Sequence, residues 1–149
     1  MTHEERNNIV AIFSNILVTI YVVFRLISLN NAGTLAGPDA LMHWARAMLW
    51  ILPIGIVLAI VGTILASIVF AIAARDPSPS FIVDERDQMI KVFGMQVTLV
   101  VVSAGFIGVL VALAFGIQGL VALIALYFAF SLADLIGNVA KFIRYRGIV

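Results

Sequence analysis

Polar side chains recur along an otherwise apolar segment near the end of the chain, at successive spacings of 4, 3, 4, 3 and 4 positions. Steps of three and four residues keep side chains on one narrow stripe of an α-helix. The stripe comprises Tyr127, Ser131, Asp134, Asn138, Lys141 and Tyr145. Because polar groups are costly in lipid, we expect this stripe to face protein or water.

Asp134 is the residue of this stripe that could carry a proton or an ion. An ionised aspartate at the centre of a bilayer costs about 2.5–3.5 kcal/mol, so it should have partners. We expect Asp134 to hydrogen-bond to Gln96, Asn15 or Asn138, because these residues reach similar depths in the membrane. The whole predicted polar intramembrane layer comprises Asp134, Asn138, Ser131, Gln96, Asn15 and Ser67.

Two interpretations of this layer compete. In the first, Asp134 titrates during transport as part of a proton or ion relay. In the second, the layer is a hydrogen-bonded clasp that fixes helix register, with each bond contributing on the order of 1 kcal/mol. We favour the clasp, because Asp134 lies only about 10 Å along the helix from Lys141 and is therefore shallow.

A charged run before the third apolar segment is the second candidate site. Acidic residues at Asp84 and Asp87 suit the first turn of a helix, where they cap it and complement its dipole. The alternative is a docking surface for a soluble partner, built with the basic residues of the C-terminus. That predicted surface comprises Asp84, Glu85, Arg86, Asp87, Lys141, Arg144 and Arg146. Helix capping is the preferred interpretation, and the basic cluster alone also suits contact with anionic lipids.

Enzymatic chemistry finds little support in the residue types. The chain has no cysteine, which excludes disulfides, thiol chemistry and cysteine metal sites. Its two histidines, His3 and His43, lack the spacing of a zinc site. No histidine or lysine falls within an apolar segment, where it could activate a serine. We therefore predict a protein that is not an enzyme and that uses neither metal nor cofactor.

Composition identifies the elements that must position these residues. The chain of 149 residues is 63% hydrophobic and 11% charged, with a mean hydropathy of +1.15. Four segments reach the roughly 20 apolar residues that a membrane-spanning helix needs, at about 9–29, 48–73, 92–115 and 120–139. We predict an all-α polytopic membrane protein, a single domain over residues 1–149, with two antiparallel hairpins in a four-helix bundle.

Basic residues predict the orientation, because they concentrate in cytoplasmic segments. Seven of them belong to the N-terminus, the loop between the second and third segments, and the C-terminus: Arg6, Arg75, Arg86, Lys91, Lys141, Arg144 and Arg146. Only Arg25 and Arg46 flank the first loop. Both ends should therefore be cytoplasmic, with Trp44 and Trp50 at the outer interface.

Local features within the spans predict how the helices pack. Pro53 falls inside the second segment and should kink it. Gly62 and Ala66, and likewise Ala104 and Gly108, have the small-xxx-small spacing that lets membrane helices approach closely.

An internal repeat is suggested by two similar helix starts. Residues 4–10 align without gaps on residues 84–90, and the match continues from Phe13 to Phe93. The chain would then consist of two hairpins related by an axis along the membrane normal. The competing explanation is that any helix entering from the cytoplasm favours acidic residues in its first turn.

The second half of the chain resembles a known group of proteins. It has the D-E-R-D motif of residues 84–87, the L-A-D stretch of residues 132–134 and the R-Y-R-G tail of residues 144–147. In these features it is similar to small bacterial four-helix inner-membrane proteins that have no assigned function. The resemblance implies a bacterial inner membrane and a shared architecture, but no reaction. Where members of the group carry a lysine soon after the acidic residue, this chain has Gly137 and Asn138.

Two functions follow as hypotheses. The first is a non-enzymatic regulatory or accessory module whose cytoplasmic face contacts another protein. The alternative is a small proton-coupled transporter that uses Asp134 and works as a dimer, since four helices alone rarely enclose a substrate path. The expected partners are the lipid bilayer, a cytoplasmic or membrane protein, and a second copy of the chain, with no nucleic acid.

Overall fold

The computed structural model describes residues 3–74 and 85–147, and these residues form helices joined by turns. The helices are α1 (His3–Asn31), α2 (Ala40–Leu49), α3 (Ile51–Ala74), α4 (Glu85–Ala114) and α5 (Gly119–Tyr145). Four stretches are long and apolar enough to cross a membrane: Glu4–Asn31, Ala40–Val69, Glu85–Ala114 and Gly119–Tyr145. The prediction of an all-α protein with four membrane spans is confirmed.

The second span is divided into α2 and α3, and the division lies at Trp50. Pro53 has no backbone N–H, so the carbonyl of Leu49 loses the hydrogen bond that would continue the helix. The kink expected from Pro53 is therefore a break that begins just before the proline. Trp44 on α2 is only 2% exposed, so its side chain packs against the protein, and its predicted place at the outer interface stays a prediction. Trp50 is exposed, as an interfacial residue would be.

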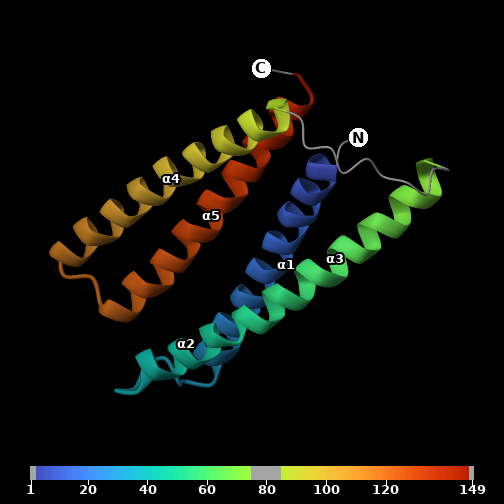
Figure 1. The fold of residues 1–149 in the computed structure, drawn as a ribbon. Helices are drawn as coiled ribbons and strands as arrows, with labels where there is room; N and C mark the ends of the chain where they lie inside the picture. The colour runs from blue at the N-terminus through green and yellow to red at the C-terminus, as the bar shows by residue number, and fades with distance from the viewer. Residues whose placement is uncertain (1–2, 75–84, 148–149) are drawn as a thin grey trace.

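The helices form an open arrangement in which α1 holds the two hairpins together (Figure 1). It packs against α3 on one side and α5 on the other, and α4 packs against α5. In the part of the chain that the structure describes, no comparable packing joins α3 to α4 or to α5. The α4–α5 pair and α3 diverge in Figure 1 towards the end where α1 begins. We call this end of the molecule, which also holds the start of α4 and the end of α5, the terminal end.

Close approach of α4 and α5 depends on glycines. A Cβ atom on Gly137 would overlap the hydroxyl of Thr98 and lie 2.9 Å from the carbonyl oxygen of Gly94. One on Gly105 would lie 2.7 Å from the Cβ of Ala129. Small residues thus let the two backbones meet, as in other membrane helix pairs.

The hairpin turn between α4 and α5 also needs a glycine. Gly116 has a φ of 85°, in the left-handed region that favours glycine. Its N–H donates to the carbonyl of Leu113 over 2.9 Å, and the N–H of Ile117 donates to that of Ala112 over 3.2 Å. These bonds satisfy carbonyls at the end of α4 and reverse the chain.

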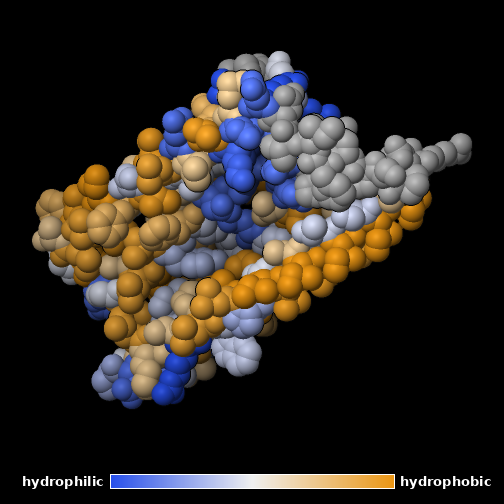
Figure 2. All heavy atoms as spheres, in the orientation of Figure 1, coloured by the Kyte–Doolittle hydropathy of each residue, from blue (hydrophilic) through white to orange (hydrophobic). Residues whose placement is uncertain are grey.

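Apolar side chains cover the outside of the spans (Figure 2). Phe115 is 86% exposed, and many other large apolar residues on α1, α3 and α4 are also exposed. Such a surface is far larger than soluble proteins expose, and a lipid bilayer is the solvent that accommodates it. The protein is therefore a polytopic membrane protein associated with a lipid bilayer.

The two copies of the suggested repeat lie in different surroundings. Arg6 and Asn8 are buried, whereas Arg86 and Gln88, which align with them, are exposed. The duplication stays a prediction.

Candidate functional site

The polar stripe of α5 meets α1 through Asn15. The amide nitrogen of Asn15 donates to Oδ2 of Asp134 over 3.0 Å and to the backbone carbonyl of Ser131 over 3.2 Å. The hydroxyl of Ser131 in turn donates to Oδ1 of Asn15 over 3.2 Å. Three members of the predicted layer, Asn15, Ser131 and Asp134, are thus brought together.

Thr19 is a member of this cluster that the sequence analysis missed. Its hydroxyl lies 2.7 Å from that of Ser131, and it donates to Oδ1 of Asn15 over 3.5 Å. Tyr127 is hydrogen-bonded to both Thr19 and Ser131. The signal was present in the sequence, because Thr19 lies four residues after Asn15 and so shares its face of α1. Asn15, Thr19, Tyr127, Ser131 and Asp134 form what we call the α1–α5 cluster.

Asn138, a further member of the predicted layer, connects the cluster to the terminal end. It is buried, and its amide nitrogen donates to the backbone carbonyl of Asp134 over 2.9 Å. Its Oδ1 accepts from Nζ of Lys141 over 2.7 Å, and its backbone carbonyl accepts from Asn8 over 2.8 Å. Asn8 is seven residues before Asn15, so α1 has a polar stripe that matches the one on α5.

Gln96 and Ser67 were predicted in this layer, but the structure places them elsewhere. Gln96 is exposed and lies two residues after Gly94, which faces α5; two residues correspond to about 200° around a helix. Ser67 is exposed on α3, and its hydroxyl donates to the carbonyl of Thr63 in its own helix over 2.8 Å. The sequence indicated how deep Gln96 and Ser67 lie in the membrane. It did not indicate which side of its helix each residue occupies, because apolar residues surround α3 and α4.

Asp134 borders an open groove between α3 and α5. The groove has a volume of about 360 Å³, and α1 forms its floor. Its lining comprises Ala11, Ser14, Asn15, Val18, Ile51, Gly55, Tyr127, Phe130, Ser131 and Asp134. Figure 2 shows hydrophilic atoms gathered between the α4–α5 pair and α3, in the space where these helices diverge. Asp134 is exposed there, because α3 does not pack against α5 to cover it. We call this feature the α3–α5 groove.

At the terminal end, polar contacts join α1, α4 and α5. Asp87 on α4 is 5% exposed and accepts a hydrogen bond from the hydroxyl of Tyr145 on α5. Nε of Arg146 lies 3.6 Å from Oε1 of Glu5 on α1, and the Arg146 side chain is 55% exposed. Asp87 was predicted on the docking surface, but it is buried among these helix ends, and the docking surface itself stays a prediction. Asp84 lies outside the described residues.

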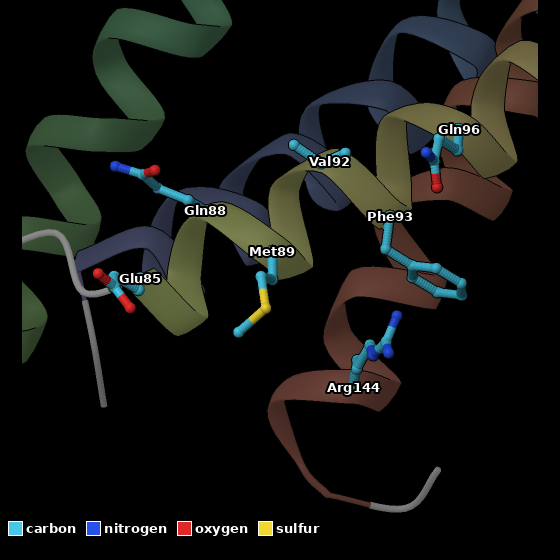
Figure 3. A pocket seen from close by; sticks show the side chains of 7 residues that line it. All are labelled: Glu85, Gln88, Met89, Val92, Phe93, Gln96 and Arg144. Atoms are coloured by element: carbon cyan, nitrogen blue, oxygen red, sulfur yellow. The ribbon is translucent and has the colours of Figure 1, made fainter.

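Other residues of the predicted docking surface remain exposed beside a surface hollow (Figure 3). The hollow has a volume of about 550 Å³ and is lined by Glu85, Gln88, Met89, Val92, Phe93, Gln96 and Arg144. Figure 3 shows the Arg144 side chain extending from α5 towards the ring of Phe93 on α4. The guanidinium carbon lies 4.3 Å from the ring centroid, which is a cation–π contact. Arg86 is also exposed, whereas Lys141 is half-buried against Gly94.

Metal ligands do not gather in the described parts of the chain, residues 3–74 and 85–147: no group of three or more His, Cys, Asp or Glu side chains could hold an ion there.

Comparisons with known proteins give no relative. No protein-family model matches the chain, and no curated protein or solved structure resembles it significantly. The resemblance to small bacterial inner-membrane proteins therefore rests on the short motifs of the sequence.

Proposed function

We propose that this chain is a non-enzymatic regulatory or accessory protein of a bacterial inner membrane. Both of its ends are cytoplasmic, and it contacts another protein through the terminal end. The distribution of basic residues supports this orientation, because Arg6, Arg86, Arg144 and Arg146 all lie at that end. The bacterial location is supported by the resemblance of residues 84–149 to inner-membrane proteins. The proposal also includes the internal repeat, in which the two hairpins are copies of one ancestral hairpin.

The observation that carries this proposal is the hollow beside Arg144. Contacts such as Asp87–Tyr145 and Glu5–Arg146 fix three helix ends relative to one another. A rigid surface binds a partner with a smaller loss of conformational entropy than a mobile one. On this surface an arginine stacked on Phe93 lies next to the exposed side chain of Met89, which is 66% exposed. Arginine, aromatic residues and methionine are the types enriched where proteins bind one another.

Site-specific photo-crosslinking tests the proposal. A photoreactive amino acid at Met89 should give one discrete protein adduct in cells that make the protein natively. The adduct should be lost when Arg144 is changed to Glu, because the charge reversal removes the cation–π contact and repels the same partner. The matched control is the same photoreactive residue at Phe115, which lies at the other end of α4 and should give only lipid adducts. An adduct at Met89 that survives Arg144→Glu would contradict the proposal.

A second function, a small proton-coupled transporter that works as a dimer, is favoured by one observation. Asp134 is exposed in a groove within a membrane span, and membrane carboxylates in such positions commonly lie on ion or substrate paths. Asp134→Asn separates the two functions. A transporter would lose activity, whereas a docking module would keep its Met89 adduct, because the near-isosteric amide keeps the shape of the α1–α5 cluster.

A further inference from the structure

The carboxylate of Asp134 is only partly satisfied by the protein. Oδ2 accepts the hydrogen bond from Asn15, and no other hydrogen bond reaches the carboxylate from a described residue. A carboxylate accepts up to about four hydrogen bonds, so most of its capacity faces the α3–α5 groove. The side chain is exposed to that groove rather than covered by a neighbouring helix.

The nearest basic residue on the same stripe attracts Asp134 through space, but it forms no direct ion pair with the carboxylate. Lys141 lies two helical turns away, which is about 10 Å along the axis. Its ammonium group donates to Oδ1 of Asn138 over 2.7 Å. No ion pair to Asp134 is formed by a residue of the described ranges. A carboxylate in a membrane without a paired cation is costly, so a cationic ligand would gain from binding there.

The rest of the groove suits an apolar group. Phe130 lies one turn from Asp134 on the same face of α5, and Tyr127 lies about 10 Å from Asp134 along the axis. Val18 on α1 and Ile51 on α3 line the same groove. The aromatic rings could also attract a positive charge through their faces. A volume of about 360 Å³ lies within the range of small-molecule sites and is too small for a transmembrane helix.

We propose that the α3–α5 groove binds a monovalent amphipathic organic cation, such as a quaternary ammonium or phosphonium compound. Its charge lies against the free oxygen of Asp134, and its apolar body lies along Phe130 and Tyr127. The ligand enters sideways from the lipid, because the groove is open where α3 and α5 diverge. An apolar molecule would leave the carboxylate unpaired, and a small metal ion would leave the apolar walls uncovered. This site does not depend on the cytoplasmic contact proposed above.

Equilibrium binding of tetraphenylphosphonium to the purified full chain in lipid nanodiscs tests the proposal. We expect saturable binding that becomes at least tenfold weaker in Asp134→Asn and is unchanged in Ser67→Ala. Ser67 is the matched control, because it is a polar residue of a span that bonds within its own helix. Tetraphenylborate, which has the same shape and the opposite charge, should not bind saturably. Equal binding of tetraphenylphosphonium to the wild type and Asp134→Asn would overturn the proposal.

A second pair of variants keeps the test valid if Asp134→Asn does not fold. Phe130→Ala should weaken binding several-fold, because the ring lines the groove. Leu132→Ala is its control, because Leu132 is similarly exposed on α5 but does not line that groove. Equal losses in both variants would contradict the assigned position of the apolar body. The Met89 adduct does not involve these residues, so either proposal can fail while the other holds.

Discussion

Asn15 donates a hydrogen bond to Asp134 over 3.0 Å and so joins the first and last helices across 119 positions of sequence. Among the described helices, α1 packs more extensively than any other against both α3 and α5, so this bond lies at the junction of the two hairpins. The arrangement agrees with the interpretation of the polar layer as a clasp that fixes helix register. It also leaves one side of Asp134 open to the α3–α5 groove.

Asn15→Leu should loosen the junction between α1 and α5. The substitution removes the bonds to Asp134 and Ser131 and leaves Asp134 without its amide donor. Hydrogen bonds between membrane helices contribute about 0.6 kcal/mol each on average and at most about 2 kcal/mol. We expect a loss of about 1–2 kcal/mol in the free energy of unfolding in detergent micelles. Ser67→Ala is the control and should change it little, whereas an equal loss in both variants would show that the clasp has no special role.

Gly137→Val should separate α4 from α5. The new side chain would overlap Thr98 and press against the backbone of Gly94, which cannot move aside as a flexible side chain would. Overpacking of this kind costs about 1–3 kcal/mol. Gly108→Val makes the same change where no atom lies within 4 Å, so its stability should stay close to that of the wild type. Thermal unfolding in micelles compares the two, and a larger loss for Gly108→Val would mean that α4 presents a different face to α5.

Two contacts at the terminal end should contribute unequally. Tyr145→Phe removes a hydrogen bond to the buried carboxylate of Asp87 and should cost about 1–3 kcal/mol of unfolding free energy. Arg146→Gln removes the 3.6 Å ion pair with Glu5, whose arginine is exposed to solvent, and such a solvent-screened pair is worth up to about 1 kcal/mol. Chemical unfolding should therefore rank Tyr145→Phe as the more destabilising variant. The reverse order would show that the ion pair, and not the buried bond, holds the helix ends together.

The sequence could predict the depth of polar residues but not always the face they occupy. Hydropathy gave the four spans, because 20-residue apolar segments are rare outside membranes. On α5 the polar stripe was visible against apolar neighbours, and Asn15 was correctly expected as a partner of Asp134. On α3 and α4 the apolar residues surround the helix, so nothing indicated that Ser67 and Gln96 face away from the cluster.

The glycine contacts show a second limit of the sequence. The spacing of Ala104 and Gly108 predicted a close helix contact, but both residues are exposed. Gly94, Gly105 and Gly137 make the contact instead. Gly94 and Gly105 on α4 are eleven residues apart, which is a spacing that a search for small residues four apart does not detect.

The membrane orientation of the terminal end tests the central claim most directly, because a cytoplasmic partner requires a cytoplasmic surface. The chain has no cysteine, so single substitutions give unambiguous labelling sites. Gln88 at the start of α4 and Gln118 before α5 are both exposed and lie at opposite ends of the α4–α5 hairpin. With a membrane-impermeant maleimide, Gln118→Cys should react in intact cells, and Gln88→Cys should react only after permeabilisation. Labelling of Gln88→Cys in intact cells, with Gln118→Cys protected, would contradict the account.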